Sequence, residues 1–196
     1  MIEGLVNRQT FNEVMVPNYA PQAMIPVRGK GSKIWDQQGN EYIDFAGGIA
    51  VSALGHCHPK LLKSLQEQSG QLWHLSNVYT NIPALSLAKR LTELTFADKV
   101  FFCNSGAEAN EAAIKLVRKY AHTHLDKVEN PIILTAKASF HGRTLATITA
   151  TGQEKYQKGF APLPAGFAYV PYNDITAVEN AITDLDEGTL SRVVGI

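Results

Sequence analysis

The clearest pattern of apolar and polar positions lies between Val100 and Tyr120, in the sequence VFFCNSGAEANEAAIKLVRKY. Its first four residues are apolar, two of them aromatic and one β-branched, which predicts a buried strand over Val100–Cys103. Ser105 and Glu108 follow at the spacing of a capping box, so Ser105 is predicted to be the N-cap of a helix. One apolar face of that helix would carry the residues at i, i+3, i+4, i+7, i+8 and i+11, namely Ala109, Ala112, Ala113, Leu116, Val117 and Tyr120.

The turn between this strand and this helix has the composition of a phosphate seat. A helix start leaves backbone N–H groups without intrahelical partners and presents the positive end of the helix dipole. Gly106 permits a close approach of backbone and anion, and Ala107 adds only a methyl group. The start of this helix is therefore a candidate phosphate site. Taken alone, an ordinary capped strand–helix junction is the better explanation, because every helix start has this geometry.

The remaining pattern predicts strands that alternate with helices. A short helix is expected over Arg8–Met15, and a small antiparallel meander over residues 25–45. Pro59 and Pro83 open two further helices, which extend to about Gln71 and Leu94. Later segments predict a strand over Ile132–Ala136, a loop over Gly159–Pro171, a helix over Ile175–Leu185 and a final strand that begins near Arg192. This alternation indicates an α/β fold with a mostly parallel sheet and flanking helices.

The strand predicted over Ile132–Ala136 is followed by residues that suit a flat, anionic ligand. The sequence after Ala136 is KASFHGRT, residues 137–144. Because ligands bind beyond the carboxyl ends of parallel strands, this segment and the phosphate seat are expected to border one crevice. Phe140 can stack on a flat ring, and the planar fork of Arg143 suits a carboxylate. Core packing for Phe140 and a surface ion pair for Arg143 are the alternatives, and their joint position favours the functional interpretation.

Composition excludes several other classes. Hydrophobic residues make up 45% of the 196 residues and charged residues 18%, and the net charge is zero, so nothing favours nucleic acid or an anionic membrane as partner. The N-terminal segment lacks a signal-peptide pattern, and Cys57 and Cys103 are interpreted as reduced thiols of a cytoplasmic protein. His56-Cys57-His58 invites a zinc site, but its spacing is wrong and we predict no metal.

Two other enzyme classes fail on their motifs. A serine hydrolase that uses Ser105 would need glycine two residues before and two after it, where Cys103 and Ala107 stand. A nucleotide phosphohydrolase would need a glycine-rich loop that contains lysine, and the chain has none. A non-catalytic module that only binds a phosphorylated ligand remains open.

Three segments together resemble the class III pyridoxal-phosphate-dependent aminotransferases, within which the likeness is greatest to acetylornithine and succinylornithine aminotransferases. These segments are YAPQAMIPVRGKGSKIWDQQGNEYIDFAGGIAVSALGHCHPKL, FFCNSGAEANEAAIKLVRKY and SFHGRTLATITATGQ. The resemblance covers the chain from about Phe11 to its end and implies a fold type I transferase with a small N-terminal meander. It also implies domains over residues 1–57 and 58–196, the second being the first part of the cofactor-binding domain.

The resemblance assigns roles to individual residues. Ser105, Gly106 and Ala107 match the loop that holds the phosphate of pyridoxal 5′-phosphate, and Phe140 matches the aromatic residue that stacks on its ring. Arg143 matches the arginine that binds the substrate α-carboxylate, and Tyr19 matches a tyrosine near the substrate side chain. Ile49 stands where ornithine δ-aminotransferases usually have tyrosine, which favours N-acylated ornithine as substrate.

The family's catalytic lysine is expected beyond Ile196, so we predict that this chain alone is inactive. The apolar residues 192–196 are typical of a buried strand, so we expect the sequence to be the N-terminal part of a longer chain. The resemblance implies transfer of the terminal amino group of N2-acetylornithine to 2-oxoglutarate in arginine biosynthesis, by a cytoplasmic homodimer. Succinylornithine in arginine catabolism is the alternative substrate, and succinyldiaminopimelate is not distinguished from either.

Overall fold

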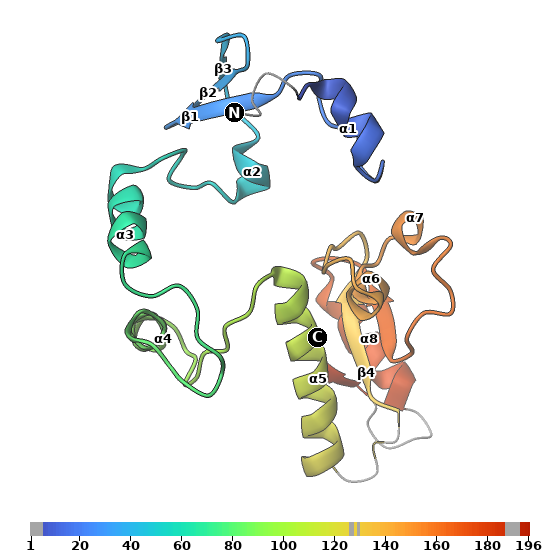
Figure 1. Ribbon diagram of the computed structural model, residues 1–196. Helices are drawn as coiled ribbons and strands as arrows, with labels where there is room; N and C mark the ends of the chain where they lie inside the picture. Colours follow the sequence, from blue (N-terminus) through green and yellow to red (C-terminus); the bar gives the residue numbers. More distant parts are fainter. Residues whose placement is uncertain (1–5, 126–127, 129, 187–192) are drawn as a thin grey trace. The chain divides into compact units, whose positions relative to one another are not determined.

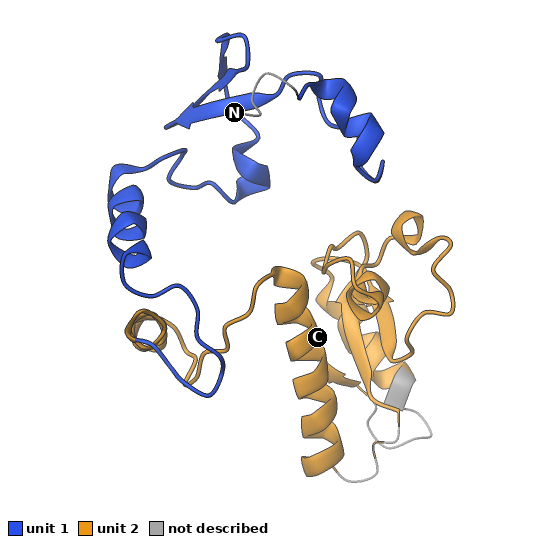
Figure 2. Ribbon diagram, in the orientation of Figure 1, with its two compact units in different colours: residues 1–81 blue, residues 82–196 orange. Residues whose placement is uncertain are grey.

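The computed structural model describes residues 6–125, 128, 130–186 and 193–196. The chain divides into two compact units, residues 1–81 and 82–196, which Figure 2 draws in different colours. Each unit is described by itself. The predicted domain division after Cys57 concerns the full-length protein and stays a prediction.

The first unit is built around the predicted antiparallel meander. Its strands β1 (Pro26–Lys30), β2 (Lys33–Asp36) and β3 (Glu41–Ile43) pair in the order β1-β2-β3. Three helices flank them in sequence: α1 (Arg8–Val14), α2 (Gly47–Ala50) and α3 (Pro59–Ser69). Pro59 lies in the first turn of α3, as predicted, because its missing N–H group costs nothing there.

A carboxylate, rather than an apolar side chain, forms the centre of this meander. Asp36 is 4% exposed and is the one described residue of the first unit in the buried class. Its carboxylate accepts hydrogen bonds from the amide of Asn40, the hydroxyl of Tyr42 and the backbone N–H groups of Gln38 and Asn40. These bonds, the side-chain bond from Asn40 first, lower the pKa of Asp36 below its ordinary value of 3.8.

A second carboxylate fixes the end of the meander. Asp44 accepts hydrogen bonds from the N–H groups of Ala46 and Gly47 and pairs with His56, whose Nε2 lies 2.8 Å from Asp44 Oδ2. The contact with His56 is the main cause that lowers the pKa of Asp44. The His56 ring also covers Gly29, where an added Cβ would lie 2.6 Å from the ring carbon Cγ. His56 therefore has a packing and hydrogen-bonding role in the described structure.

The second unit contains the parallel sheet. Its helices are α4 (Ile82–Leu94), α5 (Gly106–His124), α6 (Leu145–Ala150), α7 (Glu154–Gln157) and α8 (Ile175–Asp186), and its strands are β4 (Ile132–Ala136), β5 (Phe167–Val170) and β6 (Val193–Gly195). The strands pair in parallel in the order β5-β4-β6, which confirms the predicted α/β class. The central strand β4 carries three consecutive buried residues, Ile133, Leu134 and Thr135. Helix α5 packs on β6, where an added Cβ at Gly195 would lie 3.1 Å from Val117.

Three sequence expectations for this unit are wrong. Residues 100–103 form no strand among the described residues; Phe101 is 70% exposed and Cys103 is exposed as well. Aromatic and β-branched residues favour a strand only where another segment takes up its backbone hydrogen bonds, and no described segment pairs with this one. Strand β5 lies inside the predicted loop over Gly159–Pro171, because four residues that pair with β4 suffice despite the glycine and proline around them.

The third error concerns which face of α5 is buried. Leu116 and Tyr120 of the predicted face are 70% and 56% exposed, whereas Ile114 and Ala121 are 8% and 0% exposed. The packed face is thus turned by about one residue, roughly 100° around the helix axis. The packed face of α5 contains Asn110, Ile114 and Val117. Because Asn110 is polar, this face does not show as a continuous apolar pattern in the sequence.

The two carboxylates make the first unit sensitive to acid. A carboxyl group whose pKa is lower in the folded state stabilises that state above its unfolded pKa, and the contribution is lost as the pH falls through the folded pKa. We therefore expect the backbone amides of β2 and β3 to exchange hydrogen faster as the pH is lowered from about 5 to 3, beyond the intrinsic pH dependence of exchange. In Asp36→Asn that additional pH dependence should shrink. Asp98→Asn, at an exposed carboxylate outside the meander, should keep the wild-type dependence; equal curves for both variants would contradict the assignment.

Candidate active site at the start of helix α5

Ser105 begins helix α5, as the sequence predicts. Its backbone is extended, with φ of −155° and ψ of 161°, and its hydroxyl accepts a hydrogen bond of 3.2 Å from the N–H group of Glu108. In a capping box, the Glu108 carboxylate would accept a hydrogen bond from the backbone N–H group of Ser105. It does not do so here. It accepts instead from the backbone N–H and the side-chain amide of Asn104, at 2.5 and 3.3 Å. Glu108 thereby stabilises the residue that precedes the cap.

The first-turn amides of α5 are free to bind an anion. Gly106 and Ala107 occupy helix positions whose N–H groups have no intrahelical acceptor, and neither donates a hydrogen bond in the described part of the chain. A Cβ built on Gly106 would meet no atom within 4 Å, so the space beside it is open. Of the three predicted phosphate ligands, Gly106 and Ala107 therefore present free N–H donors at the positive helix end, and Gly106 presents no steric obstacle.

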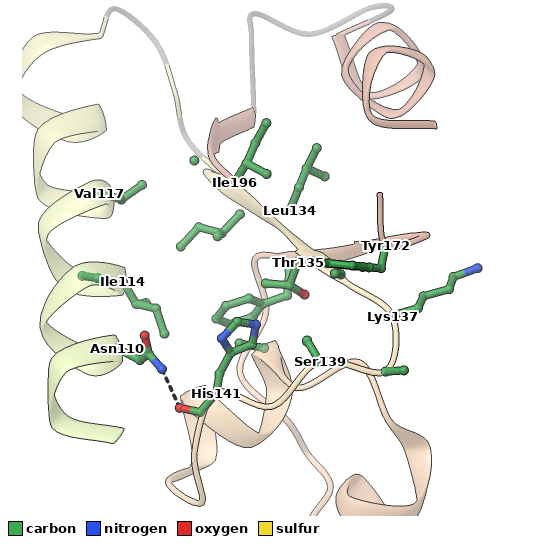
Figure 3. Close-up of a pocket in the computed structure, with 17 residues that line it drawn as sticks. Asn110, Ile114, Val117, Leu134, Thr135, Lys137, Ser139, His141, Tyr172 and Ile196 are labelled. Atoms are coloured by element: carbon green, nitrogen blue, oxygen red, sulfur yellow. Dashed lines mark hydrogen bonds between the residues drawn. The ribbon is translucent and has the colours of Figure 1, made fainter. Parts of the chain in front are cut away.

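The segment 139–144 lies directly against the first turns of this helix. Asn110 donates a hydrogen bond of 2.7 Å from Nδ2 to the carbonyl oxygen of His141, the dashed line in Figure 3. Thr144 donates from its hydroxyl to the Glu111 carboxylate at 2.5 Å, a charge-assisted bond. A Cβ added to Gly142 would lie 2.9 Å from the Cβ of Ala107. The structure thus brings the two predicted groups of residues together, on one edge of the second unit.

Side chains from the following helices hold the other end of this segment. Gln153 donates from Nε2 to the carbonyl oxygens of Ala138 and Ser139, at 3.3 and 2.8 Å. The backbone N–H of His141 donates to the hydroxyl of Thr151 at 3.0 Å, and Lys137 forms a parallel bridge with Gly152. These bonds occupy backbone groups that β4 no longer pairs, so the segment is fixed at both ends.

Phe140 and Arg143 present free surfaces on this fixed segment. The Phe140 side chain is 58% exposed, so a flat ligand can reach its ring. The guanidinium carbon of Arg143 lies 5.1 Å from the centre of the Phe140 ring and 4.5 Å from that of Tyr156. Arg143 donates no hydrogen bond and has no ion pair within the described residues, so its donors are available to a carboxylate. Core packing for Phe140 and a surface ion pair for Arg143 do not describe their surroundings.

A cavity of about 700 Å³ lies beside this segment, between α5 and β4. Among the residues that line it are Asn110, Ile114, Val117, Leu134, Thr135 and His141. Three buried polar atoms in its wall have no hydrogen-bond partner: Oγ1 of Thr135, Oγ of Ser139 and Nε2 of His141. Figure 3 shows the Lys137 side chain pointing away from the His141 ring. None of the predicted cofactor and substrate residues lines this cavity, so it is adjacent to the candidate site and distinct from it.

Two residues named from the sequence belong to the first unit. Tyr19 is 67% exposed and lies between α1 and β1, and its place in the substrate site stays a prediction. Ile49 is 91% exposed and has a φ of 58°, an unusual conformation for a β-branched residue.

Two further properties concern the described residues alone. They contain no group of three or more His, Cys, Asp or Glu side chains that could hold a metal ion. Among their helices, none has the length and apolar character that crossing a membrane requires.

Sequence reasoning missed the residues that support the site: Asn110, Glu111, Gln153 and Tyr156. A polar Asn110 and an acidic Glu111 beside the apolar positions of a helix are a weak signal of such a role. No periodic or capping pattern singles out Gln153 or Tyr156, because their contacts depend on how residues 151–157 turn back over the 139–144 segment.

Comparisons of the sequence and of the structure with known proteins both find aminotransferases. The family model described as aminotransferase class-III matches residues 14–193. The chain is 59% identical over 179 residues to an acetylornithine aminotransferase of Pseudomonas putida, covering 91% of this chain and 44% of that protein. It is 60% identical to one of Vibrio vulnificus over 183 residues, covering 93% and 45%. The chain therefore spans less than half the length of these curated relatives.

Solved structures agree with the sequence comparison. The ornithine aminotransferase of Toxoplasma gondii superposes with a TM-score of 0.85 at 29% identity, over 90% of this chain and 42% of that one. The N-acetylornithine aminotransferase of Stenotrophomonas maltophilia gives a TM-score of 0.69 at 41% identity, over 86% and 40%.

The contact of Gly142 with α5 leads to a prediction about the site's assembly. Gly142 is buried with a φ of 140°, and an added Cβ would lie 2.6 Å from Thr147 Oγ1. We expect Gly142→Ala to lower the free energy of unfolding by roughly 1–3 kcal/mol, because it combines backbone strain with overpacking. Gly106→Ala is the matched control: its Cβ meets open space, and its effect should stay within about 0.5 kcal/mol. Urea titration measures both; equal stabilities would contradict the close packing.

Proposed function

The chain belongs to the class-III aminotransferase family, and on that premise we propose that the full-length protein is a pyridoxal-phosphate-dependent aminotransferase of the acetylornithine type. It would transfer the terminal amino group of N2-acetylornithine to 2-oxoglutarate. Relatives at about 60% identity bear the name acetylornithine aminotransferase, which supports this substrate. The observation that carries the proposal is the contact of the 139–144 segment, which contains Phe140 and Arg143, with the first turns of α5, where the amide groups of Gly106 and Ala107 are open.

The residues at the start of α5 fit the cofactor. Pyridoxal phosphate, when bound, supplies an electron-accepting ring that carries the amino group between the two substrates. The backbone N–H groups of Gly106 and Ala107 would hold its phosphate, since they have no acceptor among the described residues and lie at the positive helix end. Ser105 fixes the first turn that aims them. Phe140 would cover one face of the ring with its exposed side chain.

Arg143 would bind the substrate α-carboxylate. Its guanidinium has free N–H groups in a planar fork, which matches the two oxygens of a carboxylate. A charge-assisted, two-point contact of this kind fixes the direction in which the substrate lies, so that the amine at its far end points toward the cofactor. Tyr19 would contact the substrate's side chain, as the family resemblance implies.

The catalytic lysine would lie outside these 196 residues. Lys99, Lys115, Lys137 and Lys155 do not stand in the sequence context of the family's lysine, and none is assigned that role. The relatives are more than twice the length that this chain covers. We place the amine that holds the cofactor covalently, and then moves the substrate proton, in the part of the full-length protein that corresponds to their second half.

Substrate class, assembly and location are parts of the same proposal. A relative in Yersinia pestis bears the name acetylornithine/succinyldiaminopimelate aminotransferase. N2-acetylornithine, succinylornithine and succinyldiaminopimelate all offer an α-carboxylate to Arg143 and an amine at the far end. We propose that the full-length enzyme is a cytoplasmic homodimer of arginine biosynthesis. A chain that only binds a phosphorylated ligand is the remaining alternative.

Removing the Phe140 ring tests the cofactor site. In the full-length protein we expect Phe140→Leu to weaken binding of pyridoxal phosphate about three- to tenfold, the effect of losing one stacked aromatic contact. Phe96→Leu, at a fully exposed phenylalanine, should bind it as the wild type does. Fluorescence titration of the cofactor-free protein gives both dissociation constants. Equal affinities in the two variants would remove Phe140 from the site.

The second test concerns the 196-residue chain by itself. With added pyridoxal phosphate, N2-acetylornithine and 2-oxoglutarate, it should form no glutamate, because the covalent lysine is absent, whereas the full-length protein should form glutamate. A cofactor absorbance band that survives dialysis, together with turnover by the short chain, would contradict the placement of the lysine. A full-length protein that binds the cofactor but transfers no amino group would support the binding module.

A further inference from the structure

The Arg143 guanidinium lies over two aromatic rings that come from different parts of the chain. Its guanidinium carbon is 5.1 Å from the ring centre of Phe140 and 4.5 Å from that of Tyr156, both within the range of a cation–π contact. Phe140 is expected to serve the cofactor as well. Tyr156, on the short helix α7, has the closer contact with the guanidinium and no role in the proposed chemistry.

The contacts with the two ring faces constrain Arg143 without accepting hydrogen bonds from its N–H groups. A guanidinium is planar and its N–H groups point outward in that plane, so aromatic rings that pack on its faces leave the donor edge open. Arg143 makes no hydrogen bond or ion pair within the described residues, which agrees with this. An exposed arginine otherwise loses rotamer entropy when it is fixed by a ligand. Contact with Tyr156 restricts that freedom before a ligand binds.

The short helix that carries Tyr156 is itself held in place. The backbone N–H of Tyr156 donates to the carbonyl oxygen of Gln153 at 3.0 Å, and Gln153 donates to Ser139 on the segment that carries Arg143. Gln157, the next residue, donates from Nε2 to the carbonyl oxygens of Thr149 and Thr151, at 3.2 and 2.9 Å. Helix α7 is therefore fixed both to α6 and to the 139–144 segment. Tyr156 and Arg143 are parts of one hydrogen-bonded frame.

We propose that Tyr156 is a positioning residue that holds the Arg143 guanidinium with its donor edge open, and so makes the site selective for amino donors that carry an α-carboxylate. The inference rests on the proposed function, because it concerns the same substrate site. It adds a determinant of substrate selectivity that does not touch the substrate. The preference for a carboxylate then depends on an aromatic ring thirteen positions further along the chain.

The test compares substrates with and without the carboxylate in the full-length holoenzyme. N2-acetylornithine has the α-carboxylate, and N-acetylputrescine has the same amine and acetyl group without it. We expect Tyr156→Leu to raise KM for N2-acetylornithine about three- to tenfold with kcat changed less than twofold, the effect of losing one cation–π contact. The kcat/KM for N-acetylputrescine should stay within twofold of the wild-type value. Tyr156→Phe, which keeps the ring, should behave as the wild type does.

A binding measurement gives a readout that does not depend on turnover. N2-acetylnorvaline keeps the α-carboxylate and lacks the reactive amine, so calorimetry on the holoenzyme measures its affinity alone. We expect Tyr156→Leu to weaken this binding three- to tenfold and Tyr156→Trp to bind at least as tightly as the wild type, because tryptophan has the strongest cation–π face. Lys155→Ala is the matched control, since Lys155 also contacts the Tyr156 ring, at 4.7 Å, and makes no contact with Arg143 among the described residues. The affinity of the Lys155→Ala variant for N2-acetylnorvaline should equal that of the wild type.

The outcomes separate this inference from the proposed function. A wild-type holoenzyme that transfers no amino group from N2-acetylornithine overturns the proposed function. An active enzyme in which Arg143→Ala loses N2-acetylnorvaline binding but Tyr156→Leu does not overturns the inference alone. Equal losses for both substrates in Tyr156→Leu, or tighter carboxylate binding, also overturn it, since the ring would then be structural or would compete for Arg143. If Tyr156→Leu does not fold, weaker binding by Tyr156→Trp overturns the inference and tighter or equal binding supports it.

Discussion

The candidate site depends on one packing constraint, the seating of the 139–144 segment on the first turns of α5. Two side chains of the helix hold it, Asn110 at the carbonyl oxygen of His141 and Glu111 at the hydroxyl of Thr144. Between these bonds Gly142 approaches Ala107 so closely that no side chain fits. The free amide groups at the helix start and the exposed Phe140 and Arg143 are therefore fixed at a constant separation. Such a fixed separation is needed to bind an anionic group, a flat ring and a carboxylate at the same time.

Amide and hydroxyl side chains replace the β-ladder where the chain leaves the sheet. Beyond Ala136 the backbone has few strand partners, and its polar groups still need hydrogen bonds. The side-chain amide of Gln153 donates hydrogen bonds to the carbonyl oxygens of Ala138 and Ser139. The Thr151 hydroxyl accepts one from the backbone N–H group of His141. Each bond contributes only about 1 kcal/mol, but a lost partner would leave the part-buried groups of Ser139 or His141 unsatisfied at a greater cost. These residues stabilise a loop geometry that the sheet alone cannot impose.

Much of this arrangement could be predicted from the sequence, because local rules decide it. The N-cap at Ser105, the strand β4 and the start of α3 at Pro59 follow from side-chain chemistry within a few residues. Contacts between distant segments decided the cases that failed. Residues 100–103 have strand composition without a partner, and β5 has a partner that its glycine- and proline-rich surroundings conceal. The buried face of α5 follows Asn110, a polar residue whose partner lies 31 positions away.

Residues that contact a ligand are easier to predict than residues that orient them, and the reason is physical. Phe140 and Arg143 lie three positions apart in one segment at the end of a strand. An aromatic ring and a cation together at such a place are an unusual combination, which the sequence shows directly. Tyr156 stands in a sequence that has no such feature, and its contact with Arg143 exists only because α6 and α7 turn back over the segment through the bonds of Gln153 and Gln157. That path is set by hydrogen bonds to backbone carbonyl groups, which any residue supplies and which leave no trace in the sequence around them. An orienting contact of this kind therefore has to be found in the folded chain.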